Sequence, residues 1–323
     1  MEEIKRYLIP RNGHSVSSLN WVGENLIDCV GDRVVFGLDD TSTKVRSLFG
    51  YRFDKAIISA DAQYSFIYEN LGTKGIILKE GRFVREINRS YYCADAYEYP
   101  VAFFNLADGR PVIAHCPDEY CKIEIEEIET GKKLTSRTNK PDDFFHSRLQ
   151  VSPDGRYLLS CGWVWHPWDT IELFDVERAL KEPDSLDQPW KGNLLGIEGE
   201  IHSAAFNGAG KIVIAADEDE QSKPVLCTYQ IDEDRITSSF SLEEHMGTLM
   251  PMGDFVVGFF EHPKLFNLRT GIIEHRWDDL TSGDQNSSII SHINEKLPKI
   301  ALDPKNKRFA VAGAEEITVI QLG

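Results

Sequence analysis

The sequence predicts an all-β protein, a seven-bladed β-propeller closed by its N-terminal strand. The first observation is a pattern that recurs along the chain, in which a small polar turn separates two apolar strands, as at Ala60–Gln63, Leu106–Gly109 and Ser152–Gly155. The spacing of these turns, roughly 40–50 residues, is typical of a propeller blade. The second observation is composition: 41% of the residues are hydrophobic and 11% are aromatic, and the apolar residues form short runs without a sustained helical period.

The length of the chain fits a propeller better than a single compact core. The chain has 323 residues, whereas most single domains have about 100–150. A propeller can be longer because each blade packs mainly on its neighbours. We therefore expect one domain over residues 1–323, with six or eight blades as the alternatives.

Four strands are expected in most blades. In blade one they cover 16–20, 25–30, 33–36 and 45–49; in blade two, 56–59, 65–69, 75–78 and 83–87; in blade three, 101–105, 111–115, 122–128 and 134–138. Blade four offers 148–151, 157–161 and 170–174, with no recognisable fourth strand. Blade five covers 201–206, 211–215, 224–230 and 236–240, and blade six covers 248–252, 255–260, 264–268 and 272–277.

Blade seven has three predicted strands, at 299–302, 309–312 and 317–322. Residues 3–9 also have the pattern of a strand and have no place in blade one. We expect them to be the fourth strand of the last blade, because closing the ring removes an exposed sheet edge. Two long polar insertions remain, at 176–196 and 278–298.

Parts of the sequence resemble the WD-repeat family. Gly13-His14-Ser15-Val16 before Trp21 is similar to that family's Gly-His opening, and Ser152–Ser160 is similar to its second strand. Thr170–Asp175 is similar to its Trp-Asp ending, with Phe174 in place of Trp. Matching motifs occur in blades one and four, whereas the resemblance in overall architecture covers most of the chain. It implies a propeller with many possible partners and no particular activity.

The charge of the chain excludes some classes of partner. The formal net charge is −17, from 52 acidic and 35 basic residues. Nucleic acids and anionic membranes attract clustered Lys and Arg, so we expect neither as a partner. The acidic balance favours a basic protein partner, although it also serves general solubility.

The N-terminus and the cysteines indicate in which cellular compartment the protein is expected. No apolar stretch is long enough for a signal peptide or a membrane span. The six cysteines show no disulfide framework. We expect a cytoplasmic protein with free thiols, monomeric in isolation.

Every loop between a second and a third strand carries an acidic residue. These acids are Asp32, Glu69, Asp118, Glu119, Asp169, Asp217, Glu218, Asp219, Glu220, Glu261, Glu315 and Glu316. Such loops share one face of a propeller, so the acids would create a negative potential over the central channel. Alternatively, they are turn residues bonded to the local backbone.

Five histidines stand at or shortly before a first strand, and each has one of these acids as a candidate partner. They are His14 with Asp32, His146 with Asp169, His202 with Asp217, His245 with Glu261, and His292 with Glu315. We expect structural His–carboxylate pairs, as in WD-repeat proteins, rather than a metal site or a proton relay. His115, Cys116 and Cys121 offer zinc-ligand atoms, but a structural zinc site needs a fourth ligand, so no metal is assigned.

The segment Gly162–Asp169 contains Trp163, Trp165 and Trp168 and is predicted as a loop of blade four. Tryptophan is enriched at interaction hot spots, because it buries a large area and still offers an N–H donor. The alternative is that one or two of these rings fill a gap between blades. The insertion at 278–298 joins blade six to blade seven on the same face, either as a lid or, as we favour, as a mobile loop.

The sequence favours a non-catalytic module that binds a basic protein through an acidic, tryptophan-bearing face. An inhibitor or immunity-type protein is one version. The candidate partner-binding residues are Trp163, Trp165, His166, Trp168, Asp118, Glu119, Asp217, Glu218, Asp219, Glu220 and Glu261. No catalytic residue and no cofactor are assigned, because no hydrolase, metalloprotease or phosphate-loop motif is present. The alternatives are a hydrolase or lyase with a metal or acid–base site at the channel mouth, and a scaffold subunit of a larger complex.

Overall fold

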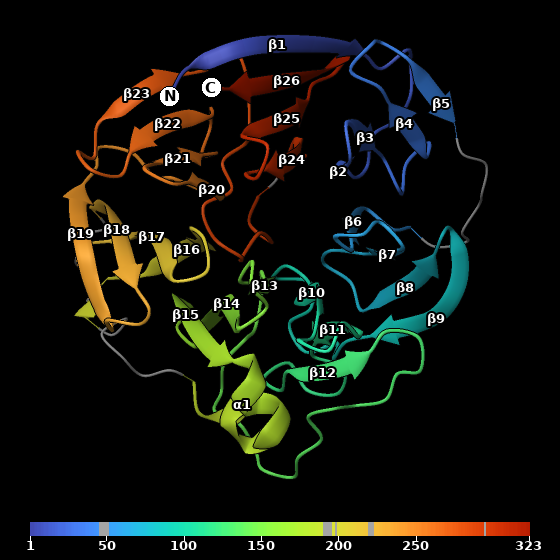
Figure 1. Cartoon of the computed structure of the whole chain (residues 1–323), viewed down its shortest axis with the longest axis vertical. Coiled ribbons are helices and arrows are strands. Elements are labelled where there is room, and N and C mark those ends of the chain that lie inside the picture. Colours follow the sequence, from blue (N-terminus) through green and yellow to red (C-terminus); the bar gives the residue numbers. More distant parts are fainter. Residues whose placement is uncertain (45–51, 190–195, 198, 219–222, 294) are drawn as a thin grey trace.

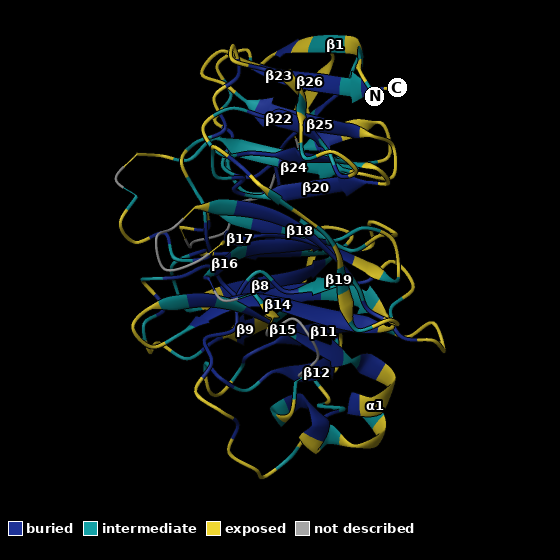
Figure 2. Ribbon diagram, turned by 90° about the vertical axis from the view of Figure 1, so that its left-hand side faces the viewer, coloured by how far each residue is buried: buried dark blue, intermediate teal, exposed yellow. Residues whose placement is uncertain are grey.

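Seven antiparallel sheets arranged in a ring account for the strands of the described chain (Figure 1). The structure is a computed structural model that describes residues 1–323 except 45–51, 190–195, 198, 219–222 and 294. The predicted all-β, seven-bladed propeller is confirmed. Exposed residues gather in the loops and at the outer edges, and buried residues lie within the sheets (Figure 2).

The first four blades follow one another along the chain. Blade one contains β2 (Asn20–Val22), β3 (Asn25–Ile27), β4 (Val34–Phe36) and β5 (Ser42–Lys44). Blade two contains β6 (Lys55–Ile58), β7 (Tyr64–Tyr68), β8 (Lys74–Lys79) and β9 (Arg82–Asn88). Blade three contains β10 (Val101–Asn105), β11 (Pro111–His115) and β12 (Glu124–Glu127). Blade four contains β13 (Gln150–Val151), β14 (Tyr157–Val164) and β15 (Trp168–Asp175), followed by α1 (Val176–Lys181) and the 3₁₀ helix η1 (Pro183–Asp187).

The last three blades complete the ring. Blade five contains β16 (Ile201–Phe206), β17 (Lys211–Asp217), β18 (Pro224–Gln230) and β19 (Arg235–Ser241). Blade six contains β20 (Leu249–Met252), β21 (Phe255–Gly258), β22 (Lys264–Asn267) and β23 (Ile273–Arg276). Blade seven contains β24 (Lys299–Asp303), β25 (Arg308–Ala312) and β26 (Glu316–Leu322), and β1 (Glu3–Pro10) pairs antiparallel with β26 as its fourth strand. The predicted closure of the ring is therefore confirmed, and the two termini lie side by side (Figure 1).

The hydrophobic core is divided among the contacts between neighbouring blades. Seven apolar clusters each join two adjacent blades, including one between blade seven with β1 and blade one. An eighth cluster, built on Tyr97, Phe145 and Trp163, belongs to no such contact. This division explains how a long chain buries its apolar residues without a single large core.

Several predicted strand positions differ in the structure. The first strand of blade one is Asn20–Val22 rather than 16–20, and the fourth is Ser42–Lys44, whereas the predicted 45–49 lies outside the described residues. Residues 134–138 form no strand, because the Thr135 hydroxyl turns inward to the Ile125 N–H and the Glu124 carboxylate. In blade four, α1 and η1 occupy the start of the predicted insertion 176–196 and bury Val176, Ala179 and Leu186 against blades three and four.

The insertion at 278–298, which we call the strap, crosses the ring to the connection between blades two and three. The Glu98 N–H donates to the Ser288 carbonyl over 3.0 Å, and the Ile290 N–H donates to the Ala96 carbonyl over 3.0 Å. Gln285, Leu297 and Pro298 line the central cavity. These contacts of the described residues favour the lid, which was the alternative, over the mobile loop.

None of the described helices is both long and apolar enough to span a membrane.

Candidate functional site

A group of aromatic rings lies where blades three and four meet the strap; we call it the aromatic surface, made of the exposed Tyr92 and Trp165 and the half-buried Tyr120. Trp165 is 45% exposed and Tyr92 is 44% exposed, with their ring centroids 6.3 Å apart. The Tyr92 and Tyr120 centroids are 5.0 Å apart. Rings that remain this accessible while packing on one another are typical of binding surfaces.

A buried base supports the aromatic surface. The rings of Phe145 and Trp163 stack with centroids 3.8 Å apart, and Tyr120 stacks on Phe145 at 4.2 Å. Tyr97 meets both Phe145 and Trp163 edge to face, and Ile289 of the strap packs against the same cluster. The base therefore ties the exposed rings to β14 and to the strap.

The tryptophan segment is not the loop that the sequence predicts. β14 extends to Val164 and β15 begins at Trp168, so the turn contains only Trp165, His166 and Pro167. Trp163 lies inside β14 and is 3% exposed, so the expectation that it contacts a partner is wrong. Trp165 and His166 lie at the exposed tip, where the φ of His166 is 133°. Trp168 is half-buried at the start of β15.

Tyr92 and Tyr97 were missed by sequence reasoning, and one buried arginine anchors the connector that carries them. The connector 89–98 folds around Arg89, whose guanidinium donates to the Ala94 and Tyr97 carbonyls of the connector. The same guanidinium donates to the Asn70 and Gly72 carbonyls in the turn between β7 and β8. The doublets Tyr91-Tyr92 and Phe144-Phe145, placed between predicted strands, were the signal available in the sequence.

The predicted acids do not form one ring. Asp118 pairs with Lys133, and Glu218 lies 3.4 Å from Lys223. Asp169 and Asp217 are buried, which contradicts the expectation that Asp217 faces a partner. Glu119 and Glu261 are exposed, whereas Asp219 and Glu220 lie outside the described residues.

The central channel is also not the negative funnel that the sequence predicts. It encloses a cavity of about 470 Å³ lined by Lys55, Arg148 and Lys299 and by one carboxylate, Glu98. Burial would raise the pKa of Glu98, but the neighbouring Lys55 and Arg148 outweigh it and hold this pKa at about 2. Arg148 reaches Glu98 over 2.7 Å from a backbone with a φ of 42°. Cations thus outnumber the carboxylate in the channel.

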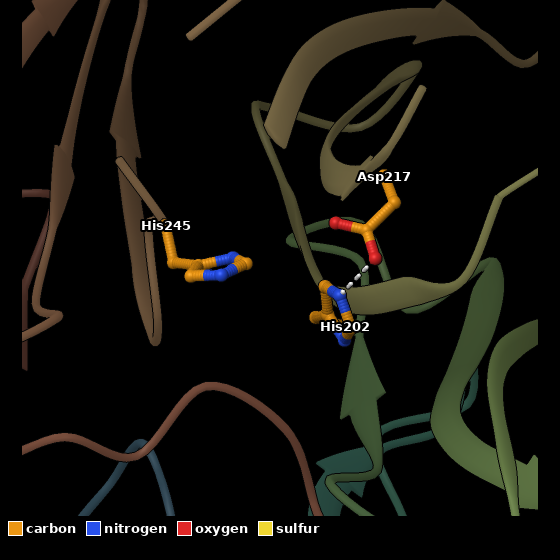
Figure 3. Close-up of side chains that lie close together, drawn as sticks. All are labelled: His202, Asp217 and His245. Atoms are coloured by element: carbon orange, nitrogen blue, oxygen red, sulfur yellow. Dashed lines mark ion pairs between the residues drawn. The ribbon is translucent and has the colours of Figure 1, made fainter. Parts of the chain in front are cut away.

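A second cluster of functional groups surrounds His202 on β16 (Figure 3). Its Nδ1 lies 3.1 Å from Oδ2 of Asp169, and its Nε2 lies 3.1 Å from Oδ2 of Asp217. The imidazole of His245 faces the same pair, with its ring centroid 5.7 Å from that of His202. Burial would lower the pKa of His202, but Asp169 and Asp217 outweigh it and raise that pKa.

Two of the five predicted His–acid pairs form. His14 lies 3.7 Å from Asp32, and His202 pairs with Asp217. Asp169 pairs with His202 instead of His146, which lies 3.8 Å from Glu172. Burial lowers the pKa of His146 to about 3, so that imidazole is neutral. His115 lies 3.2 Å from Glu126 rather than joining Cys116 and Cys121.

The comparisons with known proteins identify the architecture. No protein-family model matches the chain, and no curated protein matches it. Among solved structures, a chain of the hydrazine synthase of Kuenenia stuttgartiensis is similar, with a TM-score of 0.60, 11% identity, and coverage of 95% of this chain and 96% of that chain. A chain of a mitotic checkpoint complex is also similar, with a TM-score of 0.60, 9% identity, and coverage of 99% of this chain and 91% of that chain. At these identities the likenesses show the fold alone.

Proposed function

We propose that this propeller is a protein-interaction module that binds a basic segment of a partner protein on the aromatic surface. The observation that carries the proposal is the combination of exposed, mutually stacked rings with a rigid buried base. Interfaces are enriched in Tyr and Trp, because these side chains bury much area and lose little conformational entropy.

The surroundings of the rings favour a cationic ligand. Asp95, Glu119, Asp142 and Asp143 are exposed beside the aromatic segments, and the Tyr120 hydroxyl donates to Asp143 over 2.6 Å. An Arg or Lys side chain is attracted to the face of an aromatic ring, and a nearby carboxylate adds a hydrogen-bonded ion pair. An arginine-containing segment is therefore the partner chemistry that fits best.

Two biological roles fit such a surface. An inhibitor or immunity-type protein would cover a basic domain of its target, and its association would weaken strongly with salt. A scaffold subunit would hold its partner through a larger, more apolar contact with little dependence on salt. The net charge of −17 favours the first role.

The test measures binding of an arginine-rich peptide and of its Glu-substituted counterpart to wild-type protein and to the double variant Tyr92→Ala/Trp165→Ala. We expect the arginine peptide alone to bind, with affinity falling as salt rises, and the double variant to lose at least tenfold. Phe83→Ala is the matched control, because Phe83 is an exposed aromatic residue on β9 of blade two.

A double variant that binds as tightly as wild type would refute the aromatic surface as the binding site. Equal binding of the two peptides would refute the cationic preference. Photo-crosslinking from position 165 then identifies which segment of a captured protein lies on the rings.

A further inference from the structure

The cluster around His202 contains groups that hydrogen bonding among the described residues leaves unsatisfied. Asp217 is 4% exposed, and its Oδ1 has no hydrogen-bond partner. The Nε2 of His202 is buried, and although it lies 3.1 Å from Asp217 it has no aligned hydrogen bond. A buried carboxylate oxygen without a donor is costly, and native structures usually satisfy it with a donor or a cation.

The orientation of these atoms favours a cation between them. One oxygen of Asp217 faces His202 and the other points toward the side on which His245 lies (Figure 3). Ligand atoms of His202, Asp217 and His245 all lie within 4.8 Å of one another. Two imidazoles and one carboxylate are a common ligand set for zinc and for other divalent first-row transition metals.

The outer contact of His202 matches that of a metal ligand. Metal-bound histidines usually donate their second ring N–H to a carboxylate or a similar group. The Nδ1 of His202 lies within hydrogen-bond distance of Asp169, whose own backbone N–H donates to Glu200 over 3.0 Å. The Nδ1 of His245 lies 3.3 Å from the amide nitrogen of Asn286 on the strap. Rotating that amide by half a turn would place its oxygen there, as the acceptor that a metal-bound His245 requires.

We propose that His202, Asp217 and His245 bind a divalent transition-metal ion, with Asp169 as the outer carboxylate that orients His202. The ion joins blade five to the connection before blade six, and the three protein ligands leave a coordination position for water or an external ligand.

The charge around the site also favours a cation. Asp169, Glu200 and Asp217 surround His202. The nearest lysine of blade six, Lys264, pairs with Glu244. A divalent ion at this position would therefore reduce the excess negative charge of the cluster.

The experiment uses the full chain, stripped with a chelator and titrated first with Zn²⁺ and then with Co²⁺ as a spectroscopic probe. We expect stoichiometric Zn²⁺ binding, a raised melting temperature, and a Co²⁺ absorption spectrum that indicates nitrogen and oxygen ligands. His245→Ala should weaken Zn²⁺ binding at least tenfold, and Asp169→Asn should weaken it about 10- to 100-fold.

Two control measurements make the metal-binding result decisive. His275→Ala is the matched control, because His275 is exposed on β23 of blade six, outside the cluster, and its loss should leave the affinity unchanged. The metal-free His245→Ala protein should melt like wild type, since His245 is half-buried and forms no ion pair among the described residues. No stoichiometric binding by wild type, or equal affinity in the His245 variant, would overturn the proposal.

Discussion

The β14–β15 hairpin of blade four contributes one residue to the aromatic cluster and another to the His202 cluster, and the two residues have different roles. Trp163 on β14 and Asp169 on β15 are direct cross-strand partners. Trp163 stacks in the base of the aromatic surface, whereas Asp169 pairs with His202 of the next blade. The aromatic cluster depends on buried area, while the His202 cluster depends on which polar atoms have partners. Replacing a large side chain by alanine should therefore lower stability most in the aromatic cluster. A change of pH or the binding of a metal ion should affect stability mainly through the His202 cluster.

The largest expected effect on stability is that of replacing Trp163. Trp163→Ala should lower the free energy of unfolding by about 3–5 kcal/mol, because it leaves a cavity beside the stacked Phe145 ring. Urea denaturation followed by circular dichroism measures the change. A loss below about 1 kcal/mol would show that the rings do not depend on a buried base.

A smaller effect of opposite sign is expected on β15, at Glu172. Burial, with the nearby Asp142 and Asp187 charges, raises the pKa of this carboxyl to about 8. Its protonated form is thus favoured by folding, and stability should fall as the pH rises from about 4.5 to about 8.

Glu172→Gln imitates the protonated acid and should raise the free energy of unfolding at pH 7 by about 1–3 kcal/mol. The gain should vanish below about pH 4.5, where both states of the wild-type carboxyl bind the proton. Chemical denaturation at pH 4 and pH 7 measures it. An equal gain at both values would attribute the effect to packing rather than to titration.

A weaker effect of pH is expected at His202, because burial opposes the two carboxylates that raise its pKa. The raised pKa contributes stability below the unfolded value of about 6.5, and this contribution disappears as the pH rises through the folded value. In the metal-free Glu172→Gln protein, stability should therefore decline above about pH 6.5.

Adding His202→Gln to that protein should remove the decline. A Trp163 variant made in the same background should retain it, because no titrating group of the aromatic base is involved. Loss of the pH dependence in the Trp163 variant would mean that the two sides of the hairpin are coupled.

The smallest effect on stability is expected at Trp165. This residue lies at the exposed turn, so Trp165→Ala should change the free energy of unfolding by no more than about 0.5 kcal/mol. The same denaturation measurement applies. A loss comparable with that of Trp163→Ala would make the Trp165 ring part of the core rather than of a binding surface.

Strand positions could be predicted where alternation and turns are both local. The predicted strands at 101–105, 111–115, 201–206 and 224–230 match β10, β11, β16 and β18. The length of the β14–β15 hairpin was not predictable, because composition marks three tryptophans but not the residue at which the chain turns. Residues 134–138 also look like a strand, yet Thr135 turns inward to satisfy a buried backbone N–H of β12.

The candidate sites were predictable only in part. Tryptophan enrichment located the hairpin that carries part of the aromatic surface, and the His202–Asp217 pair followed from propeller loops. Tyr92 and Tyr120 could not be assigned to the same surface, because their stacking depends on how the Arg89 connector and blade three meet. Asp169 joined His202 across a blade boundary, which no spacing within one blade predicts.

By itself, the sequence determined the seven-bladed ring and its closure by the N-terminal strand, because hydrophobic alternation, turn residues and repeat length are encoded in neighbouring positions. Only the tertiary structure decided which tryptophan is buried, that the strap covers the channel, and that His202, Asp217 and His245 converge. Those outcomes depend on contacts between blades, where side chains distant in the sequence compete for the same space and for the same hydrogen-bond partners.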